Sequence, residues 1–377
     1  MTTRRTIPQV RPWLGEDEML AAAKAVSDNW ITEGPRSAEF VDKLNQMMGT
    51  SFGVLAPNGT LALVLGLLAL DIRPGDEVLV SNITFIASAN AVIMVGAIPI
   101  FVDVDSTTFQ IDVEKASALI GDRTRAIMPV HLYGTACDMD AVKQLASRHN
   151  LKVIEDAAQG IGVFRNGEHT GAIGDVGCFS FFADKTVTTG EGGFVVCRDR
   201  AIYDRLRLLR NQGRFDRGSF IHTAIGYNFR ITDIQSAIGL VQLAKLGQII
   251  AKKQEILAWY MEDLHGLDKV RFLEALPGSD HVPFRCVLML EGAHELMSFL
   301  ESSGVQTRGF FYPLHKQPCF ADWSRAHGWR QDLSDENFPN SLRGYDTGMC
   351  LPIYPELSRM DVRYICDRIH DYFRATW

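Results

Sequence analysis

One stretch of the chain decides its fold, and it reads V-I-E-D-A-A-Q at residues 153–159, F-S-F-F-A-D-K at 179–185 and T-T-G-E-G-G-F-V-V at 188–196. Each apolar run is short and bounded by Gly, Asp or Thr, which is typical of buried parallel strands. Similar runs precede this stretch and alternate with helix-like segments. The predicted strands are 77–80, 98–104, 126–131, 152–155, 177–182 and 193–197. This β-α-β rhythm predicts a mostly parallel sheet covered by helices on both faces.

Polar residues follow the apolar runs of the deciding stretch. They are the acid pair Glu155 and Asp156, the serine Ser180 and the lysine Lys185. Open α/β sheets bind ligands beyond the carboxyl ends of their strands, so we expect these side chains to face one crevice. Pyridoxal phosphate requires a lysine that forms a Schiff base and a carboxylate that keeps its pyridine nitrogen protonated. The pair Asp156 and Lys185 therefore predicts this cofactor.

Several motifs, in order, resemble one known family. E-D-A-A-Q, F-S-F-F-x-x-K and T-T-G-E-G-G are similar to those of the DegT/DnrJ/EryC1/StrS sugar aminotransferases, which are fold-type-I pyridoxal phosphate enzymes that form homodimers. Within this family the perosamine synthases are most similar, through P-V-H-L-Y-G at 129–134 and G-Y-N-F-R at 226–230. The resemblance runs from about Pro12 to the last predicted helix. It implies a large three-layer domain and a smaller C-terminal α+β domain.

The resemblance assigns roles to residues that would hold the cofactor. Lys185 would form the Schiff base and then move protons between the substrate and the cofactor, and Asp156 would face the ring nitrogen. Gln159 would meet the ring hydroxyl, and Phe85 would stack on the ring. For Asp156, a strand-end carboxylate that caps a helix is the structural alternative.

The phosphate of the cofactor needs donors at the start of a helix. Gly59 and Thr60 precede the apolar run 61–70, where free N–H groups and the helix dipole suit an anion, and Ser180 would add a donor. An N-G-T sequence is also a common helix cap, so a purely structural reading stays open. In the family, Asn228 reaches the phosphate bound by the neighbouring subunit, which implies a homodimer with shared active sites.

Three residues are candidates for substrate binding. Arg230 could bind the carboxylate of the amino donor, expected to be L-glutamate, because a planar guanidinium matches a carboxylate. His131 could line the substrate side or be structural. Arg285 stands where an aromatic residue is common in perosamine synthases, and it could serve a diphosphate or the carboxylate of a sugar acid.

The expected amino acceptor is a nucleotide-linked 4-keto-6-deoxyhexose, as for GDP-perosamine synthase. The alternative is an oxidised sugar acid without a nucleotide, such as an 8-oxo 3-deoxy-octulosonate. Two further classes are disfavoured. A pyridoxal phosphate regulator would carry a DNA-binding segment, and a dehydratase of this family would have His in place of Lys185.

Composition narrows the class of protein. A chain of 377 residues suits two domains, predicted at 1–250 and 251–377, with the first 40 or so residues packed on the small domain or a neighbour. The net charge of −7 and the lack of a basic run argue against a nucleic-acid partner. The polar N-terminus and the short apolar runs predict a cytoplasmic protein without a membrane span. Seven single cysteines, none in a C-x-x-C pair, predict reduced thiols and no metal site.

Overall fold

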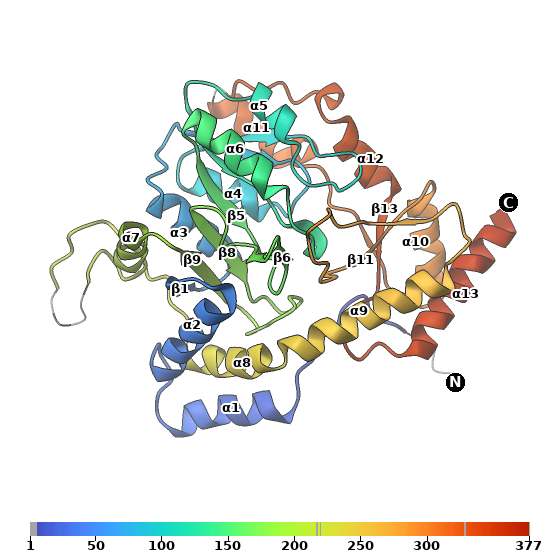
Figure 1. The fold of residues 1–377 in the computed structure, drawn as a ribbon, viewed down its shortest axis with the longest axis horizontal. Helices are drawn as coiled ribbons and strands as arrows, with labels where there is room; N and C mark the ends of the chain where they lie inside the picture. Colours follow the sequence, from blue (N-terminus) through green and yellow to red (C-terminus); the bar gives the residue numbers. More distant parts are fainter. Residues whose placement is uncertain (1–5, 216–217, 219, 328, 377) are drawn as a thin grey trace.

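A seven-stranded sheet forms the centre of the large domain. The computed structural model describes residues 6–215, 218, 220–327 and 329–376. The strands of the sheet are β1 (Phe52–Ala56), β2 (Glu77–Ser81), β3 (Ile98–Val102), β4 (Thr124–Met128), β5 (Lys152–Asp156), β8 (Val176–Ser180) and β9 (Gly193–Cys197). Their order is β1-β9-β8-β5-β4-β2-β3, and only β9 runs antiparallel to its neighbours (Figure 1). A separate hairpin pairs β6 (Phe164–Arg165) with β7 (Glu168–His169). The predicted mostly parallel α/β sheet is confirmed.

Helices cover both faces of this sheet, because successive strand residues point to opposite sides. On β4, Ala126 and Met128 enter one apolar cluster and Ile127 enters another. The helices of the large domain are α2 (Pro35–Met48), α3 (Gly59–Ala69), α4 (Ala87–Met94), α5 (Val113–Ala118), α6 (Met139–His149), α7 (Arg200–Arg210) and α8 (Asp233–Ala244). Helices α3, α4 and α7 pack on one face, while α2, α5, α6 and α8 pack on the other. The result is the predicted three-layer domain.

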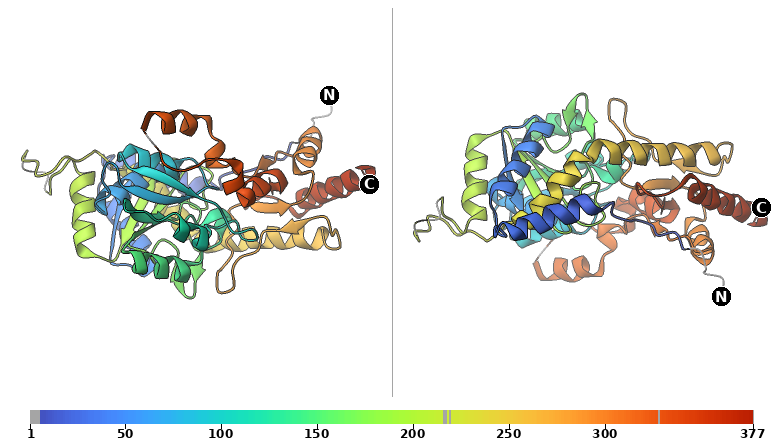
Figure 2. Two further views of the ribbon diagram at one scale, coloured as in Figure 1. Left: turned by 90° about the horizontal axis from the view of Figure 1, so that it is seen from above. Right: turned by 90° about the horizontal axis from the view of Figure 1, so that it is seen from below.

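The small domain is built on a four-stranded antiparallel sheet with the order β10-β11-β13-β12. Its strands are β10 (Arg271–Phe272), β11 (Cys286–Met289), β12 (Arg308–Gly309) and β13 (Gly348–Leu351). Helices α10 (Ala293–Ser302) and α13 (Arg359–Thr376) pack against each other beside this sheet (Figure 2). Three short helical turns, Leu132–Gly134, Leu314–Lys316 and Asp335–Asn337, and two helices, α11 (Pro318–His327) and α12 (Pro339–Thr347), complete the chain.

The N-terminal segment contacts both domains. Ile7 pairs with Val305 of the small domain, where its side chain is buried in the apolar core. Helix α1 (Glu16–Ser27) instead packs along α8 of the large domain. The segment between them therefore crosses the junction of the two domains.

The predicted helical stretch at 232–264 consists of two helices. Helix α8 begins with a capping box in which Thr232 and Gln235 satisfy each other's backbone amides. It ends at Ala244, and α9 (Leu246–Asp263) leaves at an angle of 57° and runs toward the small domain (Figure 1). Among the described residues no single helix is long and apolar enough to cross a membrane, although this bent pair meets that criterion when taken together.

Candidate active site

A cavity of about 400 Å³ lies where the carboxyl ends of β5 and β8 meet the small domain. Many of the residues predicted from the sequence line it. They are Gly59, Thr60, Phe85, Asp156, Gln159, Ser180, Lys185 and Arg285. Small-molecule ligands are typically held in cavities of this size. The fold therefore brings most of the predicted site together, as the topology of an open sheet requires.

Lys185 lies on the loop after β8. Its side chain is half-buried, and the Nζ atom lies 4.7 Å from the centre of the Phe284 ring. Burial lowers the pKa of the Lys185 amine, while the carboxylates of Asp184 and Asp156 act in the opposite direction. An amine with a lowered pKa is more often neutral, which is the form that attacks a carbonyl carbon.

Asp156 is the last residue of β5, and its side chain is 5% exposed. One carboxylate oxygen accepts a hydrogen bond from the Ser88 hydroxyl at 2.7 Å, and the other accepts one from the Ala158 amide at 3.1 Å. These two donors fix the orientation of the carboxylate while it lines the cavity. A buried carboxylate held in this way can stabilise a cation on a bound ligand.

Gln159 is held by a strained turn. Its Oε1 accepts a hydrogen bond of 2.7 Å from the Tyr133 amide, so the side-chain NH₂ group remains for a ligand. Tyr133 has a φ of 55° and Gly134 a φ of 86°, a conformation that favours glycine. A Cβ at Gly134 would lie 1.8 Å from the Val282 carbonyl oxygen. The turn thus links Gln159 to the small-domain segment before β11.

The start of α3 presents backbone amides to the cavity beside β8. Asn58 caps the helix by accepting from the Leu61 amide, while the amides of Gly59 and Thr60 have no acceptor within the helix. A Cβ at Gly59 would lie 2.7 Å from the Ser180 Cβ, so only glycine lets the two segments approach this closely. Free amides, the Thr60 hydroxyl and the Ser180 hydroxyl line one end of the cavity.

Aromatic side chains form another wall of the cavity. Phe85 is 59% exposed and lies 6.5 Å from Phe311, measured between ring centres. Phe311 in turn stacks on Tyr133 at 5.5 Å. An exposed phenylalanine at the edge of a cavity is suited to cover a planar ligand.

The other predicted residues do not line this cavity. His131 is fully buried, and its Nδ1 accepts from the Cys137 amide, so its Nε2 donates to Glu155 at 2.8 Å. These are the contacts of a structural histidine. Asn228 accepts a hydrogen bond of 2.8 Å from Arg230, and both lie on the segment that leads from α7 to α8.

Arg285 lines the cavity but is already paired. One nitrogen donates to Asp184 at 2.5 Å and another to Gln9 at 3.0 Å. The sequence prediction did not include Asp184, although it directly precedes Lys185. It also missed Arg308, a half-exposed cation at the cavity edge, 3.9 Å from Asp184. Asp184 lies in the large domain and Arg308 in the small one. A contact between distant segments of this kind leaves no local pattern in the sequence.

Residues 12–370 match the sequence model of the DegT/DnrJ/EryC1/StrS aminotransferase family. The chain belongs to this family. The aminotransferase is 37% identical to GDP-perosamine synthase from Escherichia coli O157:H7, over 97% of its own length and 98% of the relative's. It is 36% identical to UDP-N-acetyl-3-dehydro-alpha-D-glucosamine 3-aminotransferase from Acidithiobacillus ferrooxidans, over 93% and 92% of the two chains.

A solved structure agrees with this assignment. The pyridoxal phosphate form of the putative sugar aminotransferase Spr1654 from Streptococcus pneumoniae superimposes with a TM-score of 0.92 at 25% identity, covering 99% of this chain and all of the other. This chain is therefore a sugar aminotransferase that depends on pyridoxal phosphate and has the fold-type-I architecture.

The cavity of the aminotransferase fits this cofactor. An amine at Lys185, a carboxylate at Asp156 and free amides at Gly59 and Thr60 all face the same space. These groups are the ones that an aldehyde, a pyridine nitrogen and a phosphate require. These groups come from the ends of three strands: Gly59 and Thr60 follow β1, Asp156 ends β5, and Lys185 follows β8.

Proposed function

We propose that this aminotransferase moves an amino group from L-glutamate to a nucleotide-linked 4-keto-6-deoxyhexose, in the manner of GDP-perosamine synthase. The observation that carries the proposal is the shared cavity of Lys185, Asp156 and the first turn of α3. When bound, pyridoxal phosphate supplies a carbonyl group for amines and a ring that accepts electrons.

Lys185 is the proposed catalytic residue. Its amine would hold the cofactor between turnovers, and after a substrate amine displaces it, the free amine would carry a proton between the substrate carbon and the cofactor. Burial, which lowers the pKa of Lys185, favours the neutral amine that this role requires.

The surrounding residues would position the cofactor. Asp156 would keep the ring nitrogen protonated, because a buried carboxylate stabilises a neighbouring cation. The NH₂ group of Gln159 would donate to the ring oxygen. Gly59, Thr60 and Ser180 would bind the phosphate, and Phe85 would cover the ring.

The proposed homodimer completes the site. The segment that joins α7 to α8 extends away from the body of the large domain (Figures 1 and 2). Two of its apolar side chains are strongly exposed, Phe220 at 86% and Ile225 at 88%. Large exposed apolar residues of this kind mark interaction surfaces. Burial of this segment against a second copy would carry Asn228 toward the neighbour's phosphate site and place Arg230 near the L-glutamate carboxylate.

The relatives favour a nucleotide sugar over a sugar acid. The names of the E. coli and A. ferrooxidans relatives refer to GDP- and UDP-linked sugars. In this chain Arg285 is paired with Asp184 and Gln9, so it is not free to bind a substrate carboxylate, whereas Arg308 at the cavity edge is 56% exposed. A guanidinium there suits a diphosphate and a carboxylate alike, so the preference for a nucleotide sugar rests on the relatives.

A half-reaction followed in the visible spectrum tests the proposal. The cofactor is first converted to its aminated form with L-glutamate. The enzyme is then mixed separately with a GDP-linked 4-keto-6-deoxymannose and with an 8-oxo 3-deoxy-octulosonate. We expect the original absorption band to return with the nucleotide sugar alone. Return of the band with only the sugar acid would overturn the proposed nucleotide-linked substrate. The variant Lys185→Ala should show no band with either compound.

A further inference from the structure

Helix α9 carries a lysine in the middle of its inward face. The side chains that this helix buries are Leu246, Ile249, Lys253, Ile256 and Tyr260. Their spacing is that of one apolar stripe on a helix, in which Lys253 is the exception. It is 4% exposed, and buried lysines are rare unless they are paired.

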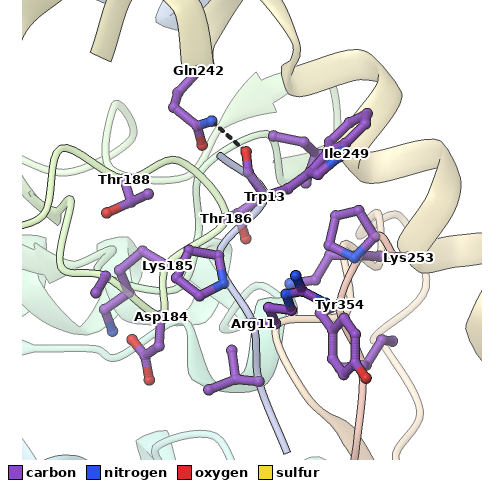
Figure 3. A pocket seen from close by; sticks show the side chains of 15 residues that line it. Arg11, Trp13, Asp184, Lys185, Thr186, Thr188, Gln242, Ile249, Lys253 and Tyr354 are labelled. Carbon is purple, nitrogen blue, oxygen red and sulfur yellow. Dashed lines mark hydrogen bonds between the residues drawn. The ribbon is translucent and has the colours of Figure 1, made fainter. Parts of the chain in front are cut away.

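Lys253 borders a small cavity directly behind the cofactor lysine. This cavity has a volume of about 20 Å³, enough for a single water molecule. Asp184 and Lys185 line it from the loop after β8, and Lys253 lines it from α9 (Figure 3). The segment from Val10 to Trp13 also lines it and is tied to α8 by a hydrogen bond from Gln242 to the Trp13 carbonyl.

The charges around this small cavity are incompletely paired. No hydrogen bond or ion pair joins the Lys253 amine to another residue in the part of the chain that the structure describes. Within the same described part, one carboxylate oxygen of Asp184 is buried without a hydrogen-bond partner, while its other oxygen is bound by Arg285. A water in the cavity could bridge the unpaired carboxylate oxygen and the unpaired amine.

Three cationic side chains, Lys185, Lys253 and Arg285, lie close to one aromatic ring, that of Phe284. The Phe284 ring centre lies 4.7 Å from the Lys185 Nζ, 5.7 Å from the Lys253 Nζ and 4.4 Å from the Arg285 guanidinium carbon. The two amines are therefore within about 10 Å of each other, in an interior where charges interact more strongly than in water. Asp184 binds Arg285 and lines the same small cavity as the two lysines.

We propose that Lys253 is a positioning residue for transamination: in its protonated form, its charge acts across the cavity shared with Asp184 and opposes protonation of the Lys185 amine. A second cation beside a reactive lysine is a known way of activating it. The two amines then take up protons as a coupled pair, in which the charging of one opposes the charging of the other.

The electrostatic environment agrees with this geometry. Burial lowers the pKa of Lys253 to about 7, with a further lowering by Arg285 and Lys185 and an opposing effect of Asp184. Arg11 from the N-terminal segment and Tyr354 after β13 complete the titratable groups around the cavity. Lys253 is therefore mostly protonated only below about pH 7, and its effect on Lys185 is largest there.

The inference rests on the proposed role of Lys185. A pH titration of the bound cofactor's absorption tests the role of Lys253 separately from that of Lys185. The test variant is Lys253→Met, which completes the apolar stripe with a side chain of similar length and should fold. Lys253→Gln is a second variant that keeps polarity without charge. The matched control is Lys252→Met, because Lys252 is exposed on the same helix.

We expect both Lys253 variants to bind the cofactor but to raise the pH midpoint of its spectral change by about 0.5 to 1 unit, since a nearby cation no longer opposes protonation. The control should keep the wild-type midpoint. Unchanged midpoints in the Lys253 variants, or failure of both to fold, would make Lys253 purely structural and overturn the inference. A wild-type enzyme that shows no visible band with pyridoxal phosphate at any pH would instead refute the role of Lys185.

Discussion

The substitution Asp156→Asn removes a charge from the site without changing its shape. The Asp156 carboxylate accepts hydrogen bonds from Ser88 and Ala158, and an asparagine can keep the bond from Ala158 and pair its NH₂ group with the Ser88 hydroxyl oxygen. The fold should therefore survive. What is lost is the proposed ion pair between the carboxylate and the protonated ring nitrogen of the cofactor.

The size of the effect follows from the burial of this carboxylate. A hydrogen bond to a charged group contributes about 1.5–3 kcal/mol, and Asp156 is 5% exposed, so the upper half of this range applies. If the ion pair strengthens in the transition state, its loss slows the reaction by about 45- to 160-fold. The rate constant of the reaction with L-glutamate, measured by stopped-flow absorbance at saturating substrate, gives this ratio directly.

The control for this experiment is Asp112→Asn. Asp112 caps α5 by accepting from the Glu114 and Lys115 amides, and asparagine is an equally good cap. It should retain the wild-type rate. A rate for Asp156→Asn within about threefold of wild type, with cofactor bound, would refute the assignment of Asp156 to the ring nitrogen.

Other predictions concern stability and assembly. Glu155→Gln should lower the free energy of unfolding at pH 7 by about 3 kcal/mol in urea titrations, because a buried carboxylate that accepts from His131 and backbone amides is neutralised. Burial raises the pKa of Glu155 but these hydrogen bonds lower it overall, so its contribution is present above the unfolded pKa, and the gap to wild type should close below about pH 4. Gly134→Ala should lower the melting temperature measurably in calorimetry, because its Cβ would overlap the Val282 carbonyl; an unchanged value would contradict the turn geometry. Ile225→Asp should shift the protein toward monomers in sedimentation velocity, and a dimer of undiminished stability would exclude that segment from the interface.

The sheet and the groups at its strand ends could be predicted because their signals are local. The sequence predicts strand β9 with its observed bounds, Gly193–Cys197, and the polar residues Asp156 and Lys185 that follow apolar runs line one cavity as expected. Buried parallel strands produce such runs wherever they occur.

Features that depend on distant contacts were not visible in the sequence. His131 follows a strand much as Asp156 ends one, but its ring faces the interior, because Glu155 lies on the opposite side of β5 from the cavity. Arg285 was considered for the substrate, yet its partner Asp184 comes from a segment about a hundred residues earlier. The bend between α8 and α9 could not be predicted either, because residues 233–263 contain no proline.

Chemical trapping shows which amine of the protein carries the cofactor, which we propose is that of Lys185. Borohydride reduction of the pyridoxal-phosphate-loaded enzyme fixes the bond between the cofactor and its amine, and peptide mass mapping then identifies the labelled residue. We expect a label on Lys185 and none on the neighbouring Lys253. A label on Lys253, or an enzyme that is left unlabelled, would contradict it.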